Sequence, residues 1–130
     1  MNRLAGKVCV ITGGSGGIGL ATGRLFAAEG ATVVLVDLNA GRLQAAVAEA
    51  GSASIHHQVA DVSDEAQMRA ALHDTVARHG RLDVLFCNAG TEGRIAPLAE
   101  MPVEDFDRVM AVNVRGVFLG LHHVLRVMQQ

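Results

Sequence analysis

The sequence lacks long apolar runs and an excess of charge of either sign. No apolar stretch approaches the roughly 18 residues that a membrane-spanning helix needs, and the opening MNRLAGK has no apolar region of the signal-peptide type. The formal net charge is −2 and the isoelectric point is about 6.3, so no basic surface favours nucleic acid or an anionic membrane. We therefore expect a soluble cytoplasmic protein without nucleic-acid or membrane partners.

Cysteine, proline and aromatic residues are also scarce. The chain has two cysteines, two prolines, no tryptophan and no tyrosine. Cys9 and Cys87 each lie in an expected strand, which favours two buried thiols in a reducing compartment over a disulfide. No repeat, low-complexity tract or linker divides the 130 residues, so we treat residues 1–130 as one domain.

What the sequence does contain is a regular alternation of short apolar runs with helical segments. The apolar runs predict strands over residues 8–11, 31–37, 54–59 and 82–87. Apolar spacing predicts helices over residues 18–29, 42–50, about 63–79 and about 103–130. Glycines follow the first three helices, and the last helix is expected to break near Asn113. This alternation predicts an α/β fold, a Rossmann-like doubly wound parallel sheet with strand order 3-2-1-4.

Five glycines lie in the stretch TGGSGGIG, residues 12–19, between the first expected strand and the first expected helix. Such a turn lets backbone N–H groups approach a diphosphate, and the helix N-terminus adds a partial positive charge. Gly13 would make the tight turn, Gly17 would allow close approach, and Gly19 would let the helix pack against the strand. Asp37, at the end of the second strand, completes a dinucleotide-binding fingerprint; a plain structural turn is the alternative.

Five segments in this order resemble the N-terminal half of a short-chain dehydrogenase/reductase: TGGSGGIG, Asp37, Asp61-Val62, CNAG (87–90) and VNVRG (112–116). The resemblance covers essentially the whole chain. The TGxxxGIG and NAG patterns argue against other Rossmann folds, such as methyltransferases. The resemblance implies an oxidoreductase that interconverts an alcohol and a carbonyl by hydride transfer with a nicotinamide cofactor.

The resemblance also implies a set of site residues. The glycine loop would line the pyrophosphate, Asp61 and Val62 would contact the adenine, and residues 88–90 would lie beside the inner ribose, with Asn88 also tying neighbouring strands together. The implied cofactor residues are Gly13, Ser15, Gly16, Gly17, Ile18, Gly19, Asp37, Leu38, Asp61, Val62, Asn88, Ala89 and Gly90. Asn113 matches the catalytic asparagine, which holds a water in the proton relay. Cys87 replaces the first asparagine of the commoner NNAG and removes one possible hydrogen bond.

Two of these residues have a purely structural alternative. Asp61 could end a strand and help to start the following helix, because aspartate is a good helix cap. Asn113 could simply be tolerated within a helix, since helix propensity is a weak constraint.

Asp37 predicts NAD as the cofactor. Its carboxylate can accept both ribose hydroxyls of NAD, whereas the 2′-phosphate of NADP would bring like charges together at a cost on the order of 4 kcal/mol at about 4 Å. The resemblance implies Arg or Lys in the glycine loop or just after the second strand when NADP is preferred, and here those positions are neutral. Arg42, slightly further on, is expected to be a solvated helix residue.

The residues that complete the family's active site are missing. Hydride transfer in the family relies on a serine after the fifth strand and a Tyr-x-x-x-Lys on the next helix. This chain has no tyrosine, its single lysine, Lys7, precedes the first strand, and every serine precedes the fourth strand. Since the sequence stops where the family continues, we expect a truncated cofactor-binding half that is inactive alone. A noncatalytic dinucleotide-binding module and a docking protein that uses the final helix are the alternatives.

The sequence contains two pairs of adjacent histidines. His56 and His57 lie on an expected strand, where neighbours face opposite sides, and His122 and His123 lie about 100° apart on an expected helix, so neither pair predicts a metal site.

The final expected helix is apolar over much of its circumference, through Val112, Val117, Phe118, Leu121, Val124, Leu125 and Met128. In the family this helix belongs to the main dimer interface, which implies a homo-oligomer.

Overall fold

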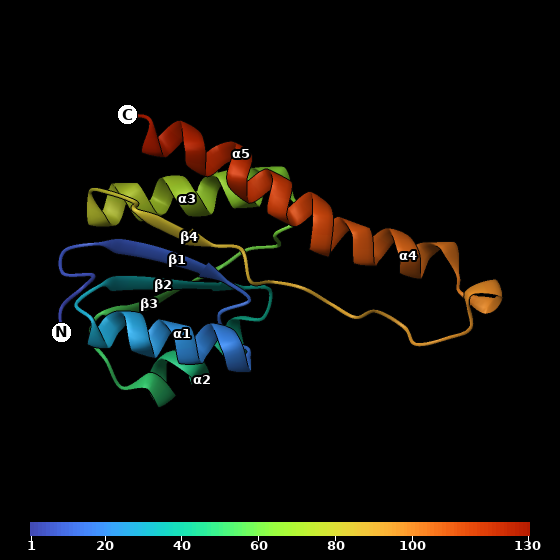
Figure 1. Ribbon diagram of the computed structural model, residues 1–130, viewed down its shortest axis with the longest axis horizontal. Helices are drawn as coiled ribbons and strands as arrows, with labels where there is room; N and C mark the ends of the chain where they lie inside the picture. The colour runs from blue at the N-terminus through green and yellow to red at the C-terminus, as the bar shows by residue number, and fades with distance from the viewer.

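The computed structural model describes all 130 residues as one four-stranded parallel sheet with helices on both faces (Figure 1). The elements are β1 (Val8–Thr12), α1 (Gly17–Ala28), β2 (Thr32–Asp37), α2 (Ala40–Ala50), β3 (Ile55–Val59), α3 (Glu65–His79), β4 (Val84–Phe86), a 3-10 turn (Leu98–Glu100), α4 (Val103–Met110), a π-helix (Ala111–Arg115) and α5 (Gly116–Met128). The strand order β3-β2-β1-β4, parallel throughout, confirms the predicted Rossmann-like topology. None of the helices combines the length and apolar character needed to cross a membrane.

Two core layers enclose the sheet, as the continuously apolar strands require. Figure 1 shows α1 and α2 on one side of the sheet and α3 and α5 on the other. The first layer contains Cys9, Ile11, Leu20, Val33, Leu35, Leu43 and Ala46. The second layer contains Val10, Val34, Val36, Met68, Leu72 and Val124. Successive residues of β1 and β2 alternate between the two layers because side chains of a strand point to opposite faces.

The ends of α2 and α3 follow the predicted glycine signals, whereas their starts are set by side-chain caps. Asn39 caps α2 by accepting a hydrogen bond from the Arg42 backbone N–H, so α2 begins two residues before the predicted start. Asp64 caps α3 in the same way. Gly51 and Gly80 follow α2 and α3 in the left-handed conformation, which confirms their predicted role as helix stops.

The fourth strand is shorter than predicted. β4 contains only Val84–Phe86, because it pairs with β1 alone and only at Cys9, Val10 and Ile11. Cys87 therefore lies just beyond β4 and is half-buried, whereas Cys9 is fully buried. Both are free thiols.

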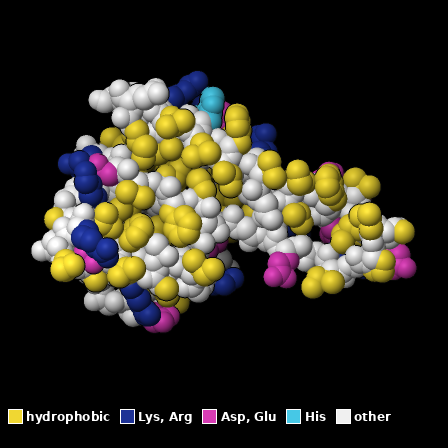
Figure 2. Space-filling model, viewed as in Figure 1, with side chains coloured by type: hydrophobic (Ala, Val, Ile, Leu, Met, Phe, Trp, Pro, Cys, Tyr) yellow, Lys and Arg dark blue, Asp and Glu magenta, His cyan; other side chains and the backbone are white.

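The last helical segment does not break at Asn113. Residues 111–115 form a π-helix that joins α4 to α5 while the backbone stays right-handed. Figure 1 shows that α4 and the loop after β4 project from the rest of the molecule. Figure 2 shows apolar side chains gathered on that projection.

Candidate functional site

A cleft of about 580 Å³ opens at the carboxyl ends of the strands. It is lined by Gly13, Gly16, Gly17, Ile18, Asp37, Leu38, Arg42, Ala60, Asp61, Val62, Asn88, Ala89, Gly90, Thr91, Arg108 and Val112. All of the predicted cofactor residues except Ser15 and Gly19 are in this set. Ligands of doubly wound sheets bind at this end, where the strand order reverses.

The glycine loop lies at one wall of the cleft. Gly13 adopts a φ of +65°, and a Cβ there would lie 2.9 Å from the Ala89 Cα. A Cβ on Gly19 would collide with the Gly13 carbonyl oxygen, so Gly19 lets α1 approach β1 closely. A Cβ on Gly17 would have no protein atom within 4 Å and would occupy the open cleft. The turn at Gly13 and the close packing at Gly19 match their predicted roles, and the empty space at Gly17 leaves room for the ligand approach predicted there.

The N-terminus of α1 presents free donors to the cleft. The N-cap is Gly16, which offers no side-chain hydrogen bond, and the first turn contains no acidic residue. The first N–H groups of a helix have no intrahelical partner, and they carry the positive end of the helix dipole. The glycine loop and this first turn can therefore bind an anion such as a diphosphate.

Asp37 is tied to the glycine loop from the end of β2. Its Oδ2 accepts hydrogen bonds from the Ser15 N–H at 3.1 Å and from the Ser15 Oγ at 2.5 Å. Its Oδ1 accepts one from the Leu38 N–H at 2.9 Å. Asp37 has no cationic partner within ion-pair distance, although the exposed side chain of Arg42 lines the same cleft. Ser15 thus acts by holding Asp37, a role that the sequence did not reveal.

Asn88 joins the end of β4 to the glycine loop. Its Nδ2 donates to the carbonyl oxygens of Thr12 at 3.1 Å and Gly13 at 3.3 Å, which confirms the predicted tie between strands. The Thr12 Oγ1 in turn accepts from the N–H groups of Asn88 and Ala89, both at 3.1 Å. Thr12 is a positioning residue that sequence reasoning missed, and its place at the head of the glycine stretch is the only signal for it.

Asp61 has the structural role that was the alternative to a binding role, and it also lines the cleft. Its Oδ1 accepts from the N–H of Ser63 at 2.9 Å and from the Ser63 Oγ at 2.6 Å, which shapes the turn before α3. The helix cap itself is Asp64. Asp61 nevertheless lines the cleft beside Val62, so the structural role does not exclude a binding role.

Asn113 lies in the π-helix, outside the lining of the cleft. Its Oδ1 accepts from the Thr91 N–H and its Nδ2 donates to the Thr91 carbonyl oxygen, both at 2.8 Å. The side chain therefore fixes the loop that follows β4. An amide has two acceptor lone pairs and two N–H donors, so one of each remains for a water.

Arg108 lines the cleft, and Cys87 directly precedes the lining residues 88–90 without itself lining it. The exposed Arg108 on α4 has no ion-pair partner, and the helical spacing to Val112 places both on one face. The predicted motifs gave no signal for Arg108. Burial raises the pKa of the Cys87 thiol, so it is protonated at neutral pH and is a poor nucleophile.

A family model and curated relatives both match this chain over nearly its whole length. A family model described as short chain dehydrogenase matches residues 7–130. Levodione reductase of Leifsonia aquatica is 45% identical over 132 residues, which cover 98% of this chain and 49% of the relative. Momilactone A synthase of Oryza sativa subsp. japonica is 46% identical over 97% of this chain and 46% of the relative. The chain thus spans about half the length of these relatives.

A solved structure agrees with these sequence matches. The crystal structure of NAD⁺-bound xylitol dehydrogenase superimposes with a TM-score of 0.89 at 40% identity, over 97% of this chain and 49% of that chain.

Proposed function

The chain belongs to the short-chain dehydrogenase family, and on that basis we propose that it forms the NAD-binding half of an oxidoreductase acting on an alcohol or carbonyl. The cleft that joins the glycine loop, Asp37 and Asn88 is the observation that carries this proposal. The free thiols fit a reducing compartment such as the cytoplasm.

The pyrophosphate of the cofactor would lie against the glycine loop. The uncapped first turn of α1 and the open space at Gly17 both support this placement, since a diphosphate needs donors and room. Asp61, Val62 and Val112 would enclose the adenine, and the segment 88–90 would face the inner ribose. When bound, the nicotinamide ring supplies the chemistry of hydride transfer.

Asp37 supports NAD over NADP. Its carboxylate is held by Ser15 and has no cation paired with it, so it stays an acceptor for ribose hydroxyls and repels a 2′-phosphate. Arg42 lines the same cleft as an exposed side chain, so salt screens its attraction for a phosphate. The proposed preference for NAD therefore rests on Asp37.

Asn113 would act in the proton relay of the complete enzyme. Its amide is locked by Thr91, which would fix the direction of its remaining donor and acceptor toward a water. The serine, tyrosine and lysine of the family's active site have no counterpart in these 130 residues. We expect the chain alone to bind cofactor without turning substrate over.

Titration calorimetry with NAD and, separately, with NADP tests the binding proposal. Folded chain should bind NAD at least about tenfold more tightly than NADP, in keeping with a like-charge contact worth a few kcal/mol before relaxation. Binding of neither nucleotide by folded protein would refute a working site in this chain. Sustained NADH production from simple alcohols by the purified chain would refute the expectation of inactivity.

A homo-oligomer is the second part of the proposal. Apolar side chains repeat every three or four residues along α4, the π-helix and α5 and remain exposed: Val103, Phe106, Met110, Val114, Phe118, Leu121, Leu125 and Met128. We name this row the α4–α5 stripe. A continuous apolar row of this kind is typical of a surface that binds a protein partner, and a second copy of the chain is the partner we propose.

A further inference from the structure

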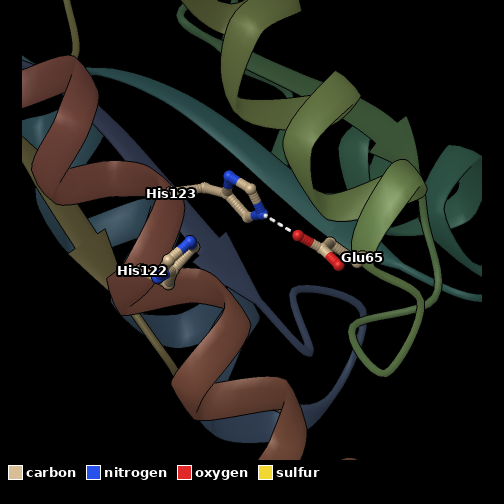
Figure 3. Close-up of side chains that lie close together, drawn as sticks. All are labelled: Glu65, His122 and His123. Atoms are coloured by element: carbon tan, nitrogen blue, oxygen red, sulfur yellow. Dashed lines mark hydrogen bonds and ion pairs between the residues drawn. The ribbon is translucent and has the colours of Figure 1, made fainter.

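A second polar cluster lies where α5 packs against the start of α3, outside the lining of the nucleotide cleft. It consists of Glu65, the first residue of α3, and His122 and His123 on α5 (Figure 3). The His123 Nε2 lies 3.2 Å from the Glu65 Oε1. The side chain of His123 is 5% exposed and that of Glu65 is 50% exposed. The cluster therefore has one buried member, His123, and one half-exposed member, Glu65.

The potential ligand atoms of the three side chains lie close to one another. These atoms, one from each residue, all lie within 4.8 Å of one another. The rings of His122 and His123 are 4.9 Å apart and nearly perpendicular, at 89°. Tetrahedral zinc, with bonds of about 2.1 Å, holds its ligand atoms roughly 3.4 Å apart. To bring the ligand atoms from within 4.8 Å to about 3.4 Å of one another, the side chains of the exposed Glu65 and the half-buried His122 would rotate, while the buried His123 stays in place.

The spacing of the two histidines alone argues against a chelate, because neighbouring helix residues diverge by about 100°. Figure 3 shows why the structure changes this argument: His123 lies between the two helices with Glu65 opposite, and His122 lies beside it on α5. Glu65 supplies a third ligand from another helix, 58 residues away in the chain. A site of this kind cannot be seen as a local sequence motif.

We propose that Glu65, His122 and His123 bind one divalent transition-metal ion of the zinc class, which links α3 to α5. Two imidazole nitrogens and one carboxylate oxygen form a donor set that zinc accepts, with a fourth position open to water. Magnesium prefers oxygen ligands and near-octahedral geometry, so it fits this set poorly. On binding, the metal replaces the hydrogen bond between His123 and Glu65 with two metal–ligand bonds.

Calorimetric titration of the chain with zinc chloride at pH 7.5 tests the proposal. We expect one ion per chain and a melting temperature that rises with zinc concentration. His122→Ala and Glu65→Gln should each raise the Kd at least tenfold, because loss of an outer-shell partner alone typically costs about 10–100-fold. Both side chains are at least partly exposed, so these variants should fold. The buried His123 is left unchanged.

Two histidine variants serve as matched controls. His73→Ala removes an exposed histidine of α3, and His79→Ala removes a ring that lies 4.9 Å from the His56 ring. Both should keep the parent Kd for zinc. Equal zinc affinity in the parent and in His122→Ala would overturn the proposal, as would loss of binding in His79→Ala instead. Magnesium chloride that binds as tightly as zinc would also overturn it.

Discussion

In the proposed function, the choice between NAD and NADP depends on the carboxylate of Asp37. Asp37→Ala should raise the Kd for NAD by about 10–100-fold, because hydrogen bonds to a charged group are each worth about 1.5–3 kcal/mol. The same change should weaken or remove the preference for NAD over NADP, since the repelling charge is lost. Calorimetric titration with both nucleotides measures the two effects. Equal affinities for NAD and NADP in the unchanged protein would contradict this account.

Replacing Gly17 or Gly19 with alanine separates the effect of this loop on NAD affinity from its effect on stability. Gly17→Ala adds a methyl group that no protein atom meets within 4 Å, so stability should hold while NAD affinity falls at least about tenfold. Gly19→Ala drives a methyl group against the Gly13 carbonyl oxygen, and overpacking of this kind typically costs about 1–3 kcal/mol. Thermal melts and NAD titrations of both variants measure these outcomes. A large loss of stability in Gly17→Ala would show that its cleft-facing position is misassigned.

At the level of single elements, the sequence predicted most of what positions the site. The continuously apolar strands, the caps at Gly51 and Gly80, and the glycine loop rest on local rules of backbone conformation, so they can be read directly from the sequence. The strand order followed from the alternation of strand and helix. The length of β4 could not be predicted, because it depends on how many residues of β1 it pairs with.

The features that the sequence did not reveal are contacts between distant residues. The bond between Ser15 and Asp37 spans 22 residues, and that between Asn113 and Thr91 also spans 22. The π-helix around Asn113 was likewise not predicted, since the sequence of residues 103–130 indicated a helix with a break near Asn113 and not a π-helix. Sequence periodicity reports which face of an element is apolar, but it does not report which polar groups meet across the fold.

Asp83 links the fourth strand to the first and gives the fold a predictable dependence on pH. Its Oδ2 accepts from the Val8 N–H at 2.9 Å, and Arg81 donates to both carboxylate oxygens at 2.8 Å. The Arg81 hydrogen bonds, ahead of those from the backbone, hold the pKa of Asp83 below its usual value of 3.8. A carboxyl with a lowered pKa in the folded state stabilises the fold above that value, and the contribution is lost as the pH falls through and below it.

Asp83→Asn should therefore lower the free energy of unfolding by about 1–2 kcal/mol at pH 7. The free energy of unfolding of the Asp83→Asn variant should also fall less steeply than that of the parent between pH 5 and pH 2, because the parent loses the stabilising contribution of Asp83 in this range. Urea unfolding at several pH values measures both effects. Glu49→Gln is the control, because its ion pair with Arg24 is exposed and such pairs contribute little. A variant curve parallel to that of the parent would rule out Asp83 as the titrating group.

The α4–α5 stripe is an exposed apolar surface of the whole molecule, in addition to the two edge strands of the sheet. β3 pairs only with β2 and β4 pairs only with β1, and the stripe is exposed along α4, the π-helix and α5. Met110, Val114 and Phe118 also border a shallow groove of about 580 Å³ on this stripe. Because apolar area removed from water contributes roughly 25 cal/mol per Å², covering the stripe contributes favourably to association. This contribution is the physical basis of the proposed association with a second copy.

Charge placed on the stripe should prevent that association. Phe118→Glu and Leu121→Glu, at side chains that are 60% and 48% exposed, should convert a dimer into a monomer without unfolding it. Two copies related by twofold symmetry would bring the introduced carboxylates together in an apolar interface, where they cannot be solvated. Light scattering coupled to gel filtration measures the mass. Leu25→Glu, at an equally exposed leucine of α1 on the other face of the sheet, should leave the dimer intact; a parent chain that is already monomeric at high concentration would eliminate the stripe as a self-association surface.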